Sequence, residues 1–317
     1  MHYSQVPQFF SLFLLLLLLC APVFQGCAKP GFRSVPADEL EKKYANENSQ
    51  FMEINGARVH FREEGSGPPL LLLHGAMASL HTWDGWAGEL RDGFRIIRVD
   101  SPGNGLTGPV PGFAHTEQGL LDFLETFVDA MALDRFYLAG NSLGGFMAWN
   151  YAVQHPDKVK KLILIAPAGY PQEPPDVIKR VSLPVVGGIA RVWAPRFMIA
   201  ANVRSAYGNP DLVSESVVNR YHELLLRPGN RRAMVEIFRA MNEKADGFDP
   251  GEKIKQISVP VLLMWGERDR WVPPAHVEKW KNDVSDLQVI TYPGAGHVPM
   301  EEFPSRTARD ARRFLCE

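Results

Sequence analysis

The chain has 317 residues, 45% of them hydrophobic, which is enough to bury one large core or two small ones. Its 34 Lys and Arg residues nearly balance 36 Asp and Glu residues, giving a formal charge of −2 without a basic stripe, which argues against nucleic acid as a partner. No Cys and His cluster has zinc-site spacing, and we expect neither a metal nor a cofactor.

Residues 1–28 have the pattern of a targeting segment. Phe9 to Phe24 is almost continuously apolar, which is short for a membrane span and typical of a signal-peptide core. The following Gln25-Gly26-Cys27 completes a stretch similar to a bacterial lipobox, in which a lipid-modified Cys follows the cleavage site, although Phe24 stands where Leu is usual. Lipid anchoring at Cys27, ordinary secretion and an uncleaved anchor stay open. We expect an exported protein, periplasmic or membrane-anchored, with membrane association through the N-terminus as one outcome.

The polar stretch 29–50 predicts a tether with one short exposed helix. The domain is expected to begin at residue 51, because 51–54 and 58–62 flank Asn55-Gly56, a hairpin signal. His60 alternates with apolar neighbours and is expected to face solvent.

Two buried strands are predicted next, at 69–73 and 94–99. The first is followed by His74-Gly75-Ala76, where we expect His74 to brace the loop. The second is followed by Asp100, interpreted as a structural hydrogen-bonding residue. The apolar period over 116–131 predicts a helix capped by Thr116.

The next stretch places a serine between a strand and a helix. Residues 136–139 are an apolar run and 146–154 are compatible with a helix, with Ser142 between them in Gly-Asn-Ser-Leu-Gly. In such a turn the chain passes very close on either side of the serine, so Gly140 and Gly144 carry no side chain. The strained backbone pushes the hydroxyl out of the sheet at a helix N-terminus, where negative charge is favoured. The pattern predicts a nucleophile rather than a chance motif in a Gly-rich loop.

A serine hydroxyl needs a base and an orienting acid. The predicted strand 159–165 ends without an acid. The predicted strand at 259–266 is followed by Glu267-Arg268-Asp269, and the one at 287–292 by a turn ending in His297. Asp269 and His297 are therefore the expected acid and base, with Glu267 as a rival that we expect to face away.

Residues 170–250 interrupt the alternation of strands and helices with many prolines and with helical periods at 212–226 and 232–241. We interpret them as a helical cap over the serine, and caps of this kind control substrate choice. Phe197, Met198 and Tyr207 either line the pocket or join the cap to the core. The basic residues Arg227, Arg231 and Arg232 are expected on a solvated face. Two more helices are predicted at 273–281 and 303–315.

The ordered set of motifs (HG after a strand, D-x-P-G-x-G, the serine turn, G-x-x-D and G-H) covers about residues 51–315 and resembles the alpha/beta-hydrolase family. The resemblance implies an α/β fold, with a mostly parallel sheet, helices on both faces and an inserted cap. Residues 51–169 and 251–317 would form the core and 170–250 the cap. It also implies an oxyanion hole made by the backbone N–H groups of Ala76 and Leu143.

The resemblance implies a serine hydrolase that cleaves carboxylic esters through an acyl-enzyme, similar to an esterase or a monoacylglycerol-type lipase. Its partner would be a small-molecule or lipid ester. Carbon–carbon bond hydrolases and cofactor-free perhydrolases have similar caps and triads, so both stay alternatives. A serine nucleophile disfavours the haloalkane dehalogenases and epoxide hydrolases, in which an Asp stands at this position. A non-enzymatic binding protein on this scaffold is disfavoured because no triad member is lost.

Overall fold

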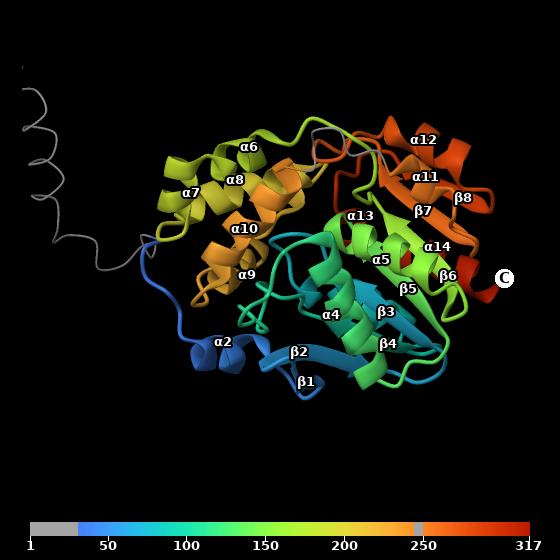
Figure 1. Ribbon diagram of the computed structural model, residues 1–317, viewed down its shortest axis with the longest axis horizontal. Coiled ribbons are helices and arrows are strands. Elements are labelled where there is room, and N and C mark those ends of the chain that lie inside the picture. Colours follow the sequence, from blue (N-terminus) through green and yellow to red (C-terminus); the bar gives the residue numbers. More distant parts are fainter. Residues whose placement is uncertain (1–30, 244–249) are drawn as a thin grey trace, which may run out of the picture.

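The computed structural model describes residues 31–243 and 250–317, so the predicted targeting segment lies outside the described residues. These residues build a sheet in the order β1-β2-β4-β3-β5-β6-β7-β8 (Figure 1). All pairs from β4 to β8 are parallel, whereas β2 pairs antiparallel with both β1 and β4. The predicted mostly parallel sheet is therefore confirmed. The strands are β1 (Ser49–Ile54), β2 (Ala57–Glu64), β3 (Pro69–Leu73), β4 (Arg95–Val99), β5 (Phe136–Asn141), β6 (Val159–Ile165), β7 (Val261–Gly266) and β8 (Leu287–Tyr292).

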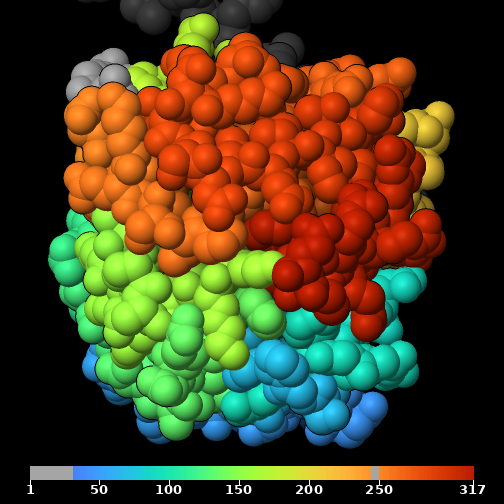
Figure 2. Space-filling model, turned by 90° about the vertical axis from the view of Figure 1, so that its right-hand side faces the viewer, coloured from blue at the N-terminus to red at the C-terminus, as the bar shows by residue number. Residues whose placement is uncertain are grey.

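Helices cover both faces of this sheet. Alternate residues of β3 enter different clusters of the core: Leu70 and Leu72 pack in the cluster with the Trp residues of η1 and α3, and Leu71 and Leu73 in the cluster with α4 and α5. A strand that is buried on both sides reads as a continuous apolar run, which is why its sequence shows no alternation. Figure 2 shows the side of the molecule where the C-terminal residues, orange to red, lie against the blue to green first half of the core. The core helices are η1 (Leu80–Trp83), α3 (Asp84–Leu90), α4 (Glu117–Ala130), α5 (Leu143–Gln154), α11 (Gly251–Ile254), α12 (His276–Asp283), α13 (Pro299–Glu302) and α14 (Pro304–Cys316).

A group of helices lies between β6 and β7 and packs together on one side of the core (Figure 1). The predicted helix at 212–226 is divided, because the Ser214 side chain accepts a hydrogen bond from the Val217 N–H and starts a new helix there. We call α6 to α10 the cap. The cap consists of α6 (Asp176–Ser182), α7 (Pro184–Ala190), α8 (Arg196–Ala206), η2 (Pro210–Leu212), α9 (Glu215–Leu225) and α10 (Asn230–Glu243).

The segment before β1 differs from the predicted tether. It contains the expected short helix, α2 (Ala37–Tyr44), but Leu40 and Val35 are buried and the Val35 N–H donates to the Leu226 carbonyl at 2.9 Å. Arg231 donates to the Gly31 carbonyl at 2.9 Å and is itself buried, so it does not belong to a solvated face. The prediction of a tether followed from the polar composition of the whole stretch. That average does not reveal the two apolar side chains that are buried when the segment docks.

His60 is also placed differently from the prediction, since it is 0% exposed. Its Nδ1 lies 2.7 Å from Asp100 Oδ2, and that carboxylate also accepts from the backbone N–H groups of Leu80 and Leu106. The structural role predicted for Asp100 is confirmed. Strand β2 is covered on both faces here, so alternation with apolar neighbours did not mean exposure.

Among residues 31–243 and 250–317, none of the helices combines the length and the apolar character needed to cross a membrane.

Candidate active site

The predicted strained turn is present at Ser142, between β5 and α5. Its backbone has φ 54° and ψ −115°, a region that is uncommon for residues other than glycine. A Cβ added to Gly140 would lie 2.2 Å from the Gly144 carbonyl oxygen, and one added to Gly144 would lie 2.2 Å from the Leu73 oxygen. Both glycines are therefore required by close backbone approach, as the sequence pattern predicted.

Asp269 and His297 meet because they follow the neighbouring parallel strands β7 and β8. Asp269 Oδ2 lies 2.8 Å from His297 Nδ1, and both residues are buried. The other oxygen, Oδ1, accepts from the backbone N–H groups of Trp271 at 2.7 Å and Val272 at 3.0 Å. Because a carboxylate held in this way can only accept, Nδ1 of the imidazole carries the proton and Nε2 has the lone pair.

The rival acid Glu267 lies on the outside of the same turn. Its side chain is exposed and accepts a hydrogen bond from the Thr291 hydroxyl at 2.9 Å. The expectation that it faces away from the imidazole is confirmed.

Ser142 and His297 line the same cavity, which encloses about 610 Å³ including its open mouth. Ala76, the first expected oxyanion donor, lines this cavity as well. Leu143, the second, is the first residue of α5, where backbone N–H groups have no acceptor within the helix. The structure thus gathers the expected nucleophile, base and one amide donor around one space, with the second donor on the residue next to the serine.

His74 braces this region as predicted. Its Nε2 accepts from the Ser101 backbone N–H at 3.0 Å and its Nδ1 lies 2.7 Å from the Gly75 oxygen. Complete burial lowers the pKa of the His74 imidazole, which favours the neutral ring that this accepting role needs.

Two residues that the sequence analysis did not identify fix the loop carrying His297. The Asn141 side chain donates to the His297 carbonyl and to the Ile165 carbonyl, each at 3.0 Å. Glu302 accepts from the backbone N–H groups of Gly296 at 2.6 Å and Gly208 at 2.9 Å, so it joins this loop to the cap. Burial raises the pKa of the Glu302 carboxyl, although these backbone donors act in the opposite direction. Asn141 and Glu302 both act through tertiary contacts, which a sequence does not show. The one available signal was the position of Asn141 next to the serine.

Trp271 also supports the imidazole. Its ring stacks on His297 with centroids 6.0 Å apart and planes at 14°, while its Nε1 donates to the Ser205 hydroxyl of the cap at 3.1 Å. A large aromatic residue two positions after the acid was the available signal for this contact.

A buried carboxylate connects the cap to the core above this cavity. Glu301 of α13 accepts from the Tyr207 hydroxyl at 2.7 Å and the Tyr221 hydroxyl at 2.6 Å, and pairs with Arg220 at 3.1 Å. Both tyrosines also line the cavity. Tyr207 therefore fulfils both alternatives left open for it, whereas Phe197 and Met198 fulfil neither because they are exposed on the outer side of the cap.

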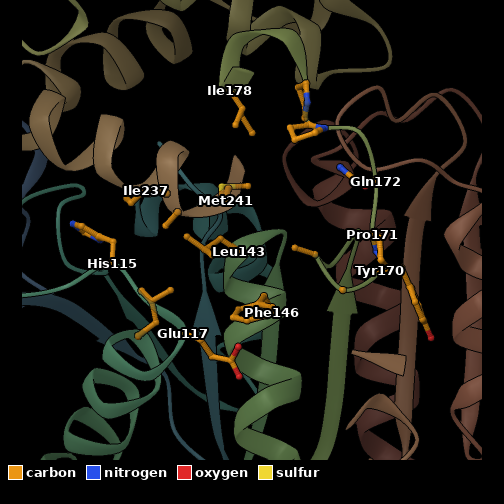
Figure 3. A pocket seen from close by; sticks show the side chains of 16 residues that line it. His115, Glu117, Leu143, Phe146, Tyr170, Pro171, Gln172, Ile178, Ile237 and Met241 are labelled. Atoms are coloured by element: carbon orange, nitrogen blue, oxygen red, sulfur yellow. The ribbon is translucent and has the colours of Figure 1, made fainter. Parts of the chain in front are cut away.

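A second, larger cavity of about 890 Å³ including its mouth lies beside the first, between core and cap. Figure 3 shows Leu143 and Phe146 of the core facing Ile178, Ile237 and Met241 of the cap. Ile178 and Met241 line both cavities, so the two spaces adjoin. Among the described residues that line them, there is no Lys or Arg. In the described part of the chain, we also find no group of three or more His, Cys, Asp or Glu that could hold a metal ion.

Known proteins resemble this chain in sequence and in fold. The sequence pattern described as "Alpha/beta hydrolase family" matches residues 70–311. The chain is 25% identical to the 2-hydroxymuconate semialdehyde hydrolase of Pseudomonas sp. (strain CF600) over 270 residues, which cover 83% of this chain and 92% of the relative. Among solved structures, it is similar to a serine hydrolase involved in carbazole degradation, with 25% identity and a TM-score of 0.73 over 84% of this chain and 98% of the other. It is also similar to a membrane phospholipase A, with 25% identity and a TM-score of 0.71 over 97% of both chains.

Proposed function

Because the chain belongs to the alpha/beta hydrolase family, we propose that it is a serine hydrolase that cleaves carboxylic esters, with Ser142 as nucleophile, His297 as base and Asp269 as the orienting acid. The Ser142 oxygen attacks the ester carbonyl while His297 Nε2 takes its proton. The N–H groups of Ala76 and Leu143 stabilise the negative oxygen of the tetrahedral intermediate, each contributing about two to three orders of magnitude in rate. His297 then returns the proton to the leaving alcohol, and water releases the acid from the acyl-enzyme.

The lack of a cation in the lining of the two cavities is the observation that favours an ester: none of their described lining residues is Lys or Arg, and the carboxylate of Glu117 is paired with Lys253 at 2.8 Å. One relative is the 2-hydroxy-6-oxo-6-phenylhexa-2,4-dienoate hydrolase of Comamonas testosteroni, whose named substrate carries a carboxylate. A carboxylate that enters an apolar cavity without a cation loses several kcal/mol of hydration. Arg220 precedes Tyr221, which lines the Ser142 cavity, but the charge of Arg220 is already paired with Glu301. A neutral ester avoids this cost.

The apolar cavity beside Leu143 supports an acyl or similar apolar group as one half of the ester. It adjoins the Ser142 cavity at Ile178 and Met241, so a chain attached to the attacked carbonyl can extend into it. The likeness to a membrane phospholipase A supports a lipid-derived ester.

Carbon–carbon bond cleavage is the second candidate, because several relatives are named for dienoate or dienoic acid substrates, and this reaction would use the same three residues here. Export, with lipidation at Cys27 or an uncleaved anchor, belongs to the proposal as well, since it depends on residues 1–28 outside the described part of the chain. A mechanism without a cofactor is also part of the proposal.

The two candidates are separated by turnover of a series of p-nitrophenyl esters from acetate to laurate against a meta-cleavage dienoate. We expect kcat/KM to rise with acyl length and to exceed that of the dienoate by at least about a hundredfold, because the uncharged acyl chain gains apolar contacts and the carboxylate loses hydration. Ile178→Trp should narrow the passage between the cavities and reduce turnover of the long esters while that of acetate stays within about twofold. Faster cleavage of the dienoate than of every ester would establish the second candidate instead.

A further inference from the structure

The outer side of the cap exposes an unusual amount of apolar surface. Of the nine large apolar side chains exposed in the described residues, eight are Phe32 or lie between Leu183 and Met198. Val185 is 75% exposed and Phe197 69%. Single exposed apolar residues are normal, but a cluster of this kind marks an interaction surface. We call it the cap patch, defined by Phe32, Val185, Val186, Ile189, Val192 and Phe197.

The cap patch is continuous across two parts of the chain. Residues 183–198 run through α7 to the start of α8, and most of them are exposed or half-buried, with Gly187, Ala194 and Pro195 buried beneath the others. Phe32 joins them because its ring stacks on Trp193 with centroids 5.7 Å apart, and because the Ala194 N–H donates to the Gly31 carbonyl at 3.1 Å. In Figure 1 these helices lie together at the far side of the cap from the core.

The charges around the patch are positive. Residues 183–198 contain Arg191 and Arg196 but no Asp or Glu, and Arg33 is exposed next to Phe32. Arg196 is paired with Glu215, so Arg33 and Arg191 are cations of the two patch segments, and the guanidinium of Arg239 lies beside Gly187 of α7, 3.1 Å from where a Cβ would stand. An apolar surface with basic residues beside it is the combination that binds anionic lipid surfaces.

The chain reaches the patch directly from the segment predicted to be membrane-directed. Arg231 and Ala194 hold Gly31 against the cap. Cys27 precedes Gly31 by four residues, which span at most about 14 Å. A membrane attachment at or before Cys27 would therefore hold the cap patch near the bilayer surface.

The helices below the patch also form the wall of the Ser142 cavity. Ile178 of α6 and Val203 of α8 line that cavity, while Val185 and Phe197 face outward from the same part of the cap. Helix α8 thus contributes both to the outer apolar surface, through Phe197, and to the cavity of the nucleophile, through Val203.

We propose that the cap patch docks on the surface of an anionic lipid bilayer, and that substrate enters the Ser142 cavity from the membrane. Entry of substrate from the membrane rests on the proposed ester hydrolase function, whereas docking does not.

Docking is tested on the full chain with a photoreactive diazirine amino acid at Val185 and, as the matched control, at Leu212, the exposed apolar residue of the described chain that lies outside the region of the patch. Illumination with vesicles of phosphatidylcholine and phosphatidylglycerol should give at least about fivefold more lipid adduct at Val185 than at Leu212. Equal adducts at both positions would overturn the proposal. So would a crosslink from Val185 to residues 1–30 of the same chain, or to a second copy.

Substrate entry is tested with a variant carrying Val185→Ser, Ile189→Ser and Phe197→Ser, compared with Leu212→Ser. We expect the patch variant to lose about tenfold in turnover of a long-chain ester embedded in the vesicles, because the apolar contacts with the bilayer are removed, while turnover of soluble p-nitrophenyl butyrate is unchanged. Equal turnover of the embedded ester by both variants would overturn entry from the membrane. If the unmodified chain hydrolysed neither ester, the proposed function would fail while the crosslinking result still decided docking.

Discussion

Two sets of serine, histidine and aspartate in the described part of the chain share a contact between the aspartate and Nδ1 of the histidine. In the core, His60 joins Asp100 at 2.7 Å through Nδ1 and the Ser49 hydroxyl at 3.0 Å through Nε2. At the cavity, His297 Nδ1 joins Asp269 at 2.8 Å, and His297 and Ser142 line the same space.

The two serines differ in their hydrogen-bond partners, their backbone conformation and their access to a cavity. The Ser49 oxygen accepts from Arg62 Nε at 3.1 Å and from the Asn46 backbone N–H at 3.2 Å, and its residue begins the regular strand β1. Its lone pairs are occupied and its histidine is completely buried, so a substrate carbonyl has no access. Ser142 has a positive φ, opens on a cavity and starts a helix. The order of contacts alone therefore does not make a nucleophile; the strained turn, the cavity and the backbone donors around it do.

The largest expected difference between the two sets is in the serines themselves. Ser142→Ala should reduce kcat for an ester by about 10⁵-fold or more, because it removes the attacking oxygen. Ser49→Ala should leave kcat within about twofold, since this residue lines neither of the two cavities described above. Steady-state kinetics on both folded variants measure this. A comparable loss in Ser49→Ala would show that the core set takes part in turnover after all.

The acids should differ next. Asp269→Asn should reduce kcat by about 10³ to 10⁴-fold, because an amide in place of the carboxylate favours the wrong tautomer of His297. The control is Glu267→Gln on the same turn, which should stay within about twofold because its exposed side chain contacts Thr291 instead. Near-normal turnover in Asp269→Asn would remove this residue from the mechanism.

Asp100 should show its effect in stability rather than chemistry. Burial alone would raise the pKa of Asp100, but the hydrogen bond and charge of His60 lower it to about 2, below the roughly 3.9 of an unfolded Asp. Its contribution to the free energy of unfolding is therefore complete above about pH 4 and is lost as the pH falls from there through about 2. Asp100→Asn should cost about 3 kcal/mol at pH 7, because it leaves buried donors without their acceptor.

Urea unfolding at pH 7 and pH 3 measures this cost. The gap between Asp100→Asn and the unmodified chain should narrow at pH 3, as the carboxylate becomes protonated in the unfolded chain. A gap of the same size at both values would mean that the charge of Asp100 does not contribute.

The same contrast shows how far sequence reasoning reaches. Strands β3 and β6 begin and end where predicted because continuous apolar runs bounded by polar turns leave one interpretation. The serine turn was equally readable, because close backbone approach restricts Gly140 and Gly144 to glycine and this restriction is visible locally. The acid and the base followed from where the strands end.

Contacts between distant segments could not be read in this way. The burial of His60 depends on what covers β2, and the roles of Glu302, Glu301 and Asn141 depend on partners up to 219 residues away. The docking of residues 31–48 depends on two apolar side chains whose partners lie in the cap and core. The periodicity of apolar residues describes one helix or strand at a time, so it does not predict contacts between distant segments.

The cap leaves the core after β6 and returns to it at α11, and the chain on its two sides meets there, because a Cβ added to Gly169 would lie 3.5 Å from the Ile254 side chain. The two ends of the insertion therefore lie close together, and the pairing of the strands does not depend on how much chain is placed between them. A lineage or an engineer can exchange the whole module and with it the choice of substrate. The replacement has to supply an acceptor for the His297 backbone N–H, now the Ala206 carbonyl, and a donor for Glu302, now the Gly208 N–H. It also has to supply partners for the Glu301 carboxylate and the Trp271 indole, which the cap now provides.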